Sequence, residues 1–154
     1  MIIYRKATIN DIDNLAKIRS IFIMEATDCS EIERNKLEIA NKTYFDSAFA
    51  DNSFIAWLAL DNDKIIATSG LSFSVVPPAP DCLNGKVAYI MNMYTFPDYR
   101  KQGIGMELLK RIVEEAKSRD YNKITLYATD SGKSLYKKYG FENVELDDMV
   151  FYIK

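Results

Sequence analysis

The sequence predicts an α/β fold that forms one domain with a mixed sheet, and three observations support this. Residues 89–95 have the composition of a buried strand, and a turn with two glycines joins them to an amphipathic helix over 104–116. Two apolar runs, 54–60 and 64–73, have the length and spacing of a hairpin. Amphipathic spacing over 12–22 indicates a helix nearer the N-terminus. A chain of 154 residues is long enough to bury a sizeable core within one domain that spans residues 1–154.

The N-terminal third predicts one strand and two helices. Ile2–Ala7 is the expected strand, and Asn10-Asp11 then offers polar side chains to cap a helix. The second helix is expected from Glu31 to about Phe49, with a less regular pattern. The apolar stripe of the first helix consists of Ile12, Leu15, Ile18, Ile21 and Phe22.

The middle of the chain predicts a hairpin followed by a loop. Its strands, Phe54–Leu60 and Lys64–Phe73, are joined by the turn Asp61–Asp63. Their almost continuous apolar character is typical of strands that are covered on both faces. Residues 77–80, with three prolines, cannot pair in a sheet and predict an exposed loop.

The strongest pattern lies after this loop. The strand Tyr89–Thr95 should end before Pro97, because proline cannot donate to a sheet. The following helix has an apolar stripe with four-residue spacing, widened on one side; its members are Ile104, Leu108, Leu109, Ile112, Val113 and Ala116.

Two further strands are expected toward the C-terminus. Lys123–Ala128 has the composition of a buried strand, and Met149–Ile153 should form a last strand. This last strand is predicted to pair near a strand that follows Phe141.

Composition excludes several classes of function. The chain is 48% hydrophobic and 27% charged, which is ordinary for a globular protein, and its net charge of −2 argues against a general nucleic-acid binder. No apolar run approaches the roughly 18 residues of a membrane span, and no signal-peptide pattern is present. Two cysteines without ligand spacing fit a reducing, cytoplasmic location. Because histidine is absent, histidine-based triads are excluded and a zinc enzyme or other metal site is not expected.

The segment Arg100–Met106 has the features of a phosphate cradle. Gly103 and Gly105 allow a close approach of the backbone to a ligand, and unpaired N–H groups at a helix start attract anions. Arg100 and Lys101 add positive charge. A P-loop would need Lys-Ser or Lys-Thr after the last glycine, and a dinucleotide fingerprint would need a third small residue where Leu108 stands, so neither motif fits.

The cradle instead resembles the pyrophosphate loop of the GNAT superfamily of N-acetyltransferases. In that pattern an Arg or Gln is followed by two residues, Gly, one residue, and Gly or Ala, as Arg100, Gly103 and Gly105 are here. Downstream, Leu135-Tyr136 and Gly140-Phe141 are similar to the superfamily's second signature, at the expected distance. Two signatures in the right order, each preceded by a strand, make the resemblance specific over about residues 86–141.

The resemblance implies a mostly antiparallel sheet with a V-shaped splay between two central strands. It implies the use of acetyl-CoA as co-substrate and direct transfer of the acetyl group to a primary amine in a ternary complex. The cradle would bind the pyrophosphate, and the edge of 92–95 would pair with the pantetheine. A backbone N–H near Met93 or Tyr94 would stabilise the oxyanion. The implied cofactor-binding residues are Met93, Tyr94, Thr95, Arg100, Lys101, Gln102, Gly103, Ile104, Gly105, Met106, Ser131 and Tyr136. Plain core packing is the alternative for Met93.

Tyr136 is implied to be the general acid that protonates the departing thiolate, although a tyrosine packed on a helix is the alternative. Many relatives have Asn where Thr129 stands and Ala where Gly132 stands. The usual amide contact to the cofactor is therefore absent, and Asp130 or Ser131 is expected to replace it.

The residues leave the general base open. Many relatives use a Glu near the central strand, and residues 86–96 contain none. Glu25 or Asp28, after the first helix, could serve instead, and Asn92 could orient the amine or a water. An amine of low pKa would need no dedicated base.

The acceptor is also open, since neither a small-molecule amine nor a peptide amine is favoured by the residues. An alternative function is a non-catalytic acyl-CoA-binding or sensor domain, because the strand Glu is missing. The expected partners are acetyl-CoA and an amine, with no nucleic acid and no membrane, and the resemblance is compatible with a homodimer.

Overall fold

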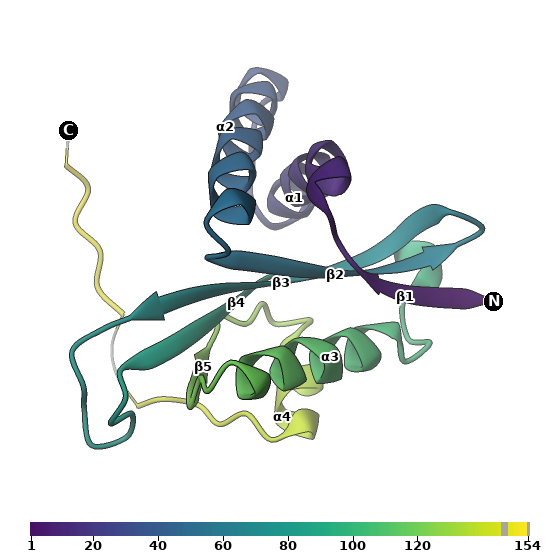
Figure 1. Ribbon diagram of the computed structural model, residues 1–154. Coiled ribbons are helices and arrows are strands. Elements are labelled where there is room, and N and C mark those ends of the chain that lie inside the picture. Colours follow the sequence, from purple (N-terminus) through teal and green to yellow (C-terminus); the bar gives the residue numbers. More distant parts are fainter. Residues whose placement is uncertain (146–147, 154) are drawn as a thin grey trace.

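The computed structural model describes residues 1–145 and 148–153, and its centre is one five-stranded sheet (Figure 1). The strands lie in chain order and pair antiparallel, except that the last two are parallel. This confirms the predicted mixed, mostly antiparallel sheet. The strands are β1 (Ile2–Lys6), β2 (Phe54–Asp61), β3 (Lys64–Val75), β4 (Lys86–Thr95) and β5 (Lys123–Thr125).

Helices cover both faces of the sheet. Figure 1 shows α1 (Ile12–Ala26) and α2 (Glu31–Ala50) on one face, with α3 (Ile104–Ser118) and α4 (Lys133–Tyr139) on the other. Each face has its own apolar core, one between α1, α2 and β2 and one between α3, α4 and the strands. The predicted burial of the hairpin on both faces is confirmed, because β2 and β3 lie between these layers. Short 3₁₀ turns at Ile9–Asp11 and Pro97–Tyr99 lead into α1 and away from β4.

The splay between β4 and β5 is confirmed, and it positions the site. Residues 87–89 of β4 pair with 123–125, and β5 then ends. The β5-facing edge of β4 is therefore unpaired from Ile90 to Thr95 within the described part of the chain. Main-chain groups on such an edge must find another partner, which can be a ligand.

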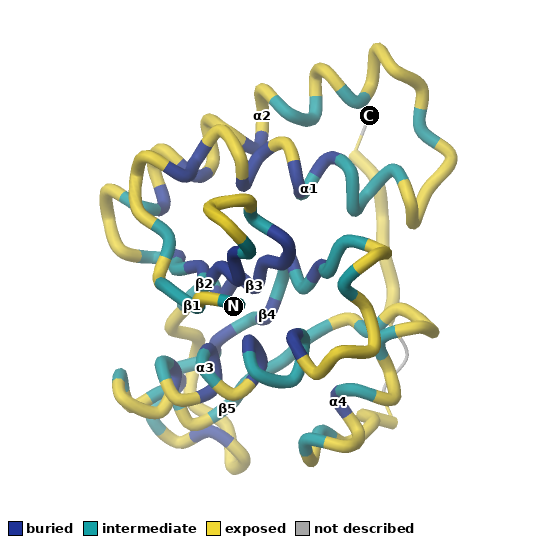
Figure 2. Tube along the Cα trace, turned by 90° about the vertical axis from the view of Figure 1, so that its right-hand side faces the viewer, coloured by how far each residue is buried: buried dark blue, intermediate teal, exposed yellow. Residues whose placement is uncertain are grey.

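Two strand predictions were wrong. The expected strand 123–128 ends at Thr125, and Tyr127 beyond it is 72% exposed. Met149–Ile153 forms no strand, and its side chains are exposed, as the outlying segment next to the C-terminus in Figure 2 shows. Residues 141–145 are also irregular, so the expected neighbouring strand is not formed. A strand without a neighbour cannot satisfy its backbone groups, whatever its residue propensities.

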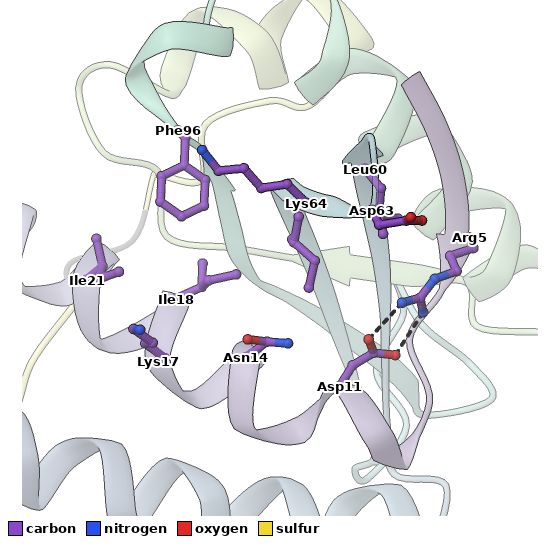
Figure 3. Close-up of a pocket in the computed structure, with 11 residues that line it drawn as sticks. Arg5, Asp11, Asn14, Lys17, Ile18, Ile21, Leu60, Asp63, Lys64 and Phe96 are labelled. Atoms are coloured by element: carbon purple, nitrogen blue, oxygen red, sulfur yellow. Dashed lines mark hydrogen bonds and ion pairs between the residues drawn. The ribbon is translucent and has the colours of Figure 1, made fainter. Parts of the chain in front are cut away.

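The cap predicted at Asn10-Asp11 is formed in part. Asp11 is the N-cap residue of α1 but makes no side-chain hydrogen bond to that helix. Its carboxylate instead accepts from the backbone N–H of Thr8, which completes a capping box at the 3₁₀ turn, and from both terminal nitrogens of Arg5, each at 2.8 Å. Figure 3 shows this ion pair at the edge of a cavity of about 430 Å³ between α1 and the end of the β2–β3 hairpin. The pair joins β1 to the beginning of α1. The hydrogen bonds from Arg5 hold the pKa of Asp11 below its usual value, against the opposing effect of burial.

We expect Asp11→Asn to lower the free energy of unfolding by about 1–2 kcal/mol at neutral pH, since Arg5 is partly exposed and solvent screens the pair. A depressed folded-state pKa gives stability that is present above the unfolded pKa of about 3.9 and is lost as the pH falls through the folded pKa. The difference between wild type and variant should therefore shrink below about pH 4. Urea unfolding across pH measures this. Asp13→Asn, which removes an exposed pair with Lys42, is the control and should change little.

Among the described residues, no helix has both the length and the apolar content that crossing a bilayer requires.

Candidate active site

A cavity of about 1,020 Å³ opens where β4 parts from β5. Its walls come from the second half of α1, from β4, from the turn before α3 and from α4 with the segment that precedes it. Of the predicted site residues, Gln102, Asp28 and Asp130 do not line it, and the Gln102 side chain instead donates to the backbone oxygen of Asp98 at 3.0 Å. Asp28, the alternative base, is exposed and does not line the cavity. The lining residues that were predicted are Glu25, Asn92, Met93, Tyr94, Thr95, Arg100, Lys101, Gly103, Ile104, Gly105, Met106, Ser131 and Tyr136.

A bulge in β4 shapes the floor of this cavity. The β3–β4 register shifts between Thr68 and Gly70, and Asn92 opposite the shift has φ of +56°. Asparagine tolerates this left-handed conformation better than most residues. The hydroxyl of Thr68 donates to the backbone oxygen of Asn92 at 2.8 Å and holds the bulge in place. A bulge bends the strand and changes the direction of the backbone groups that follow it. The backbone around Met93, which lines the cavity, therefore does not have the orientation of a regular strand.

The cradle is the N-terminus of α3. Gly103 precedes the helix with φ of +82°, and Lys101 also has a positive φ of 61°. The first intrahelical bond runs from the N–H of Glu107 to the oxygen of Gly103 at 3.1 Å. The N–H groups of residues 104–106 therefore precede the helical ladder and lie at the positive end of the helix dipole. This is the arrangement of an anion site, and it lines the cavity.

Glu25, Tyr94 and Arg100 form one polar cluster at the rim. The Tyr94 hydroxyl donates to Glu25 at 2.5 Å, and Arg100 donates to the other carboxylate oxygen at 2.9 Å. Arg100 also donates to the backbone oxygen of Thr95 at 2.8 Å. The hydrogen bond from Tyr94, with the added effect of Arg100, lowers the pKa of Glu25. Burial raises the pKa of Tyr94 to about 12, and the hydrogen bond to Glu25 acts in the same direction with a smaller effect.

Tyr136 lies in the wall that α4 contributes. It is 8% exposed, and its hydroxyl makes no hydrogen bond to another described residue. Burial, and to a lesser extent Tyr89, raises the pKa of Tyr136 to about 12. Gly140 ends α4 with φ of +121°, and its N–H donates to the backbone oxygen of Tyr136 at 3.1 Å. Gly140 thereby caps α4 at its C-terminus and fixes Tyr136 one turn before the helix end.

Sequence reasoning missed Arg19. Its Nε donates to the side-chain oxygen of Asn41 on α2 at 3.0 Å, and its Nη1 donates to that of Asn92 at 2.5 Å. A signal was present, because Arg19 stands four residues after Leu15 and three before Phe22, within the apolar stripe of α1. A charge at such a position is unusual unless it has a partner or a function.

Comparison with known proteins identifies the family. The family model described as acetyltransferase (GNAT) family matches residues 15–141, which is most of the chain. This chain belongs to the GNAT acetyltransferase family. Membership makes it an acetyltransferase and confirms the resemblance seen in the cradle and in the Tyr136 segment.

Solved structures agree with the family assignment. A predicted acetyltransferase from Clostridium acetobutylicum, solved with acetyl-CoA, shares 36% identity at a TM-score of 0.91, with 98% of this chain and 96% of that chain covered. A GCN5-related N-acetyltransferase from Ralstonia eutropha JMP134 shares 25% identity at a TM-score of 0.89, with coverage of 98% and 99%. Glucosamine-6-phosphate N-acetyltransferase from Arabidopsis thaliana, at 17% identity and a TM-score of 0.72 over 99% of each chain, shares the fold.

Proposed function

We propose that this GNAT acetyltransferase transfers the acetyl group of acetyl-CoA to a primary amine by direct attack within a ternary complex. The observation that carries the proposal is one continuous cavity that joins an anion cradle, an unpaired strand edge and the Tyr136 phenol. The Clostridium relative bound to acetyl-CoA supports the choice of co-substrate. The acceptor is a small-molecule or peptide amine.

Coenzyme A binding follows from the two main-chain features. The N–H groups of 104–106 would bind the pyrophosphate, with Arg100 and Lys101 supplying charge. The open edge of β4 over 92–95 would pair with the amides of the pantetheine. Ser131, which lines the same cavity before α4, would contact the cofactor in place of the missing Asn.

The thioester would then lie between the β4 bulge and α4. A backbone N–H at Met93 or Tyr94 would stabilise the oxyanion that forms when the amine attacks, an effect typically worth about 10²–10³ in rate. As the intermediate collapses, the C–S bond breaks and the thiolate leaves. The Tyr136 phenol, which like any tyrosine of pKa about 10 or above is protonated in the neutral range, would donate a hydrogen bond and then its proton to that sulfur.

The base remains the least constrained role. Glu25 lines the cavity, but both of its oxygens are already bonded and its lowered pKa weakens it as a proton acceptor. We therefore propose that Glu25 acts mainly by holding Arg100 and Tyr94 at the rim. If Glu25 is instead the base, Glu25→Gln should remove an acidic limb from the pH profile of kcat/KM. If it positions Arg100, the variant should keep that limb and raise the KM for acetyl-CoA.

Incubation of the protein with acetyl-CoA and a panel of amines tests the proposed function. Released thiol should appear only when an amine is present, in equal amount to the N-acetylated product. Absence of thiol release with every amine, despite measurable binding of coenzyme A, would favour the non-catalytic alternative.

A further inference from the structure

The α1 wall of the active-site cavity carries a cation, Arg19, that has no counter-charge among residues 1–145 and 148–153. Arg5, Arg100 and Arg111 each form an ion pair with a carboxylate at 2.8–2.9 Å. Arg19 is partly buried and, within the described ranges, its side-chain bonds go to the neutral amides of Asn41 and Asn92. Amide oxygens orient a guanidinium but do not neutralise it.

The surroundings of Arg19 leave this charge uncompensated. The titratable groups that act on its charge are the phenols of Tyr89 and Tyr44. A phenol with an ordinary pKa of about 10 is neutral near pH 7, and burial raises the pKa of both further. Burial also lowers the pKa of Arg19 itself. Taking a charge out of water is costly unless a partner of opposite charge compensates.

Donors remain available at the same place. A guanidinium has five N–H donors, and the two bonds to Asn41 and Asn92 leave three without a partner among the described residues. The amide nitrogens of Asn41 and Asn92 are also buried and make no hydrogen bond there. Arg19 and Asn92 both line the cavity, whereas Asn41 does not, so an acceptor atom in the cavity would be within reach of the Arg19 and Asn92 donors.

The position of Arg19 connects this charge to the chemistry. Arg19 contacts the side chain of Asn92, and the next residue along β4 is Met93, whose N–H is a candidate for the oxyanion contact. Of the other cations that line the cavity, Arg100 and Lys101 lie at the cradle, where the pyrophosphate would bind, and Lys138 is on α4. With acetyl-CoA bound as proposed, Arg19 would lie on the side from which the acceptor approaches, near the reacting carbonyl.

We infer that Arg19 binds an anionic group of the acceptor, and that the substrate class is a primary amine carrying a carboxylate. This inference rests on the proposed function and adds the identity of the acceptor class to it. A singly charged, planar carboxylate matches one guanidinium fork. A dianionic phosphate would need more charge than α1 supplies, since the remaining ionised group on that wall, Glu25, is negative.

The test compares acceptors that differ only in the anion. Initial rates are measured with glycine, β-alanine and 4-aminobutanoate, each against the amine that lacks its carboxylate, and with O-phosphoethanolamine. For the best chain length we expect kcat/KM to be at least about tenfold higher with the carboxylate than with either alternative. Equal rates with the neutral amine would overturn the inference and leave the proposed function intact, and a preference for the phosphate would overturn the carboxylate assignment.

Variants separate binding of the anion from support of the fold. Arg19→Met should reduce kcat/KM for the carboxylate at least about tenfold and leave the neutral amine within about twofold, while Arg19→Lys restores part of the preference. Lys17→Met removes an exposed charge from the same helix outside this cavity and should change neither rate. An equal loss with both acceptors would mean that Arg19 only supports the fold, and would overturn the inference.

A binding measurement covers the case in which no amine is turned over or Arg19→Met does not fold. Wild-type protein saturated with coenzyme A is titrated by calorimetry with N-acetyl-β-alanine and with N-acetylethylamine. Tighter binding of the carboxylate by at least about tenfold supports the inference independently of turnover, and equal binding overturns it.

Discussion

Tyr136→Phe is expected to lower kcat by about 10²–10⁴, the usual contribution of a general acid. The expected loss is large because Tyr136 is buried, lines the cavity and has a hydroxyl free of bonds to the other described residues. Phenylalanine keeps the ring that packs edge-on against Phe141 at 5.8 Å, so affinity for coenzyme A should change by less than about threefold. Stopped-assay kinetics and calorimetry measure the two quantities.

The matched control for this variant is Tyr139→Phe. Tyr139 is on the same helix and packs against the same core, but it does not line the cavity. The kcat of the Tyr139→Phe enzyme should therefore equal that of the wild type. Because the pKa of Tyr136 is about 12, its ionisation should cause no loss of activity up to about pH 10. A Tyr136→Phe enzyme with wild-type kcat would remove Tyr136 from the mechanism.

Gly105→Val is expected to weaken coenzyme A binding at least about tenfold, or about 1.4 kcal/mol in binding free energy. A Cβ at Gly105 would lie 3.5 Å from a methyl of Leu135 and 4.0 Å from the Thr95 hydroxyl, and both residues line the cavity. The side chain would therefore fill space in the cradle. Its contacts within the protein are ordinary, so the free energy of unfolding should change by only about 1 kcal/mol.

Two further variants serve as controls for the expected loss of coenzyme A affinity in Gly105→Val. Gly105→Ala should give a smaller loss of affinity, because only the Cβ is added. Lys110→Val places the same β-branched residue on the exposed side of α3 and should leave affinity unchanged. Wild-type affinity in Gly105→Val would show that the diphosphate does not bind at this helix start.

Local patterns were sufficient where short-range chemistry decides the structure. The stripe of α3, the glycine turn before it and the C-cap at Gly140 all depend on residues within a few positions of one another. For this reason the cradle could be named from its own residues, whereas Tyr136 was named from the resemblance to the GNAT family, and the structure places both in one cavity. The proposed roles of these residues await the experiments above.

Contacts between residues that are distant in the chain decided those features that local sequence patterns could not predict. Asp11 takes part in the predicted helix start through its bond to Thr8, but its ion pair with Arg5 of β1 could not be predicted from neighbouring residues. Met149–Ile153 has strand composition but no strand beside it. Glu25 was a candidate base by its place near the end of α1, and its hydrogen bonds to Tyr94 and Arg100, which lie about 70 residues along the chain, could not be predicted from local patterns.

The sequence by itself determined the fold class and the helix N-terminus that forms the anion cradle, because periodicity and glycine conformations are properties of neighbouring residues. Tyr136 was identified only through the resemblance of its segment to the second GNAT signature. Only the tertiary structure decided which charges are compensated. The Glu25–Arg100 pair and the uncompensated Arg19 join segments that are distant in the chain, and a charge is balanced by what surrounds it in space.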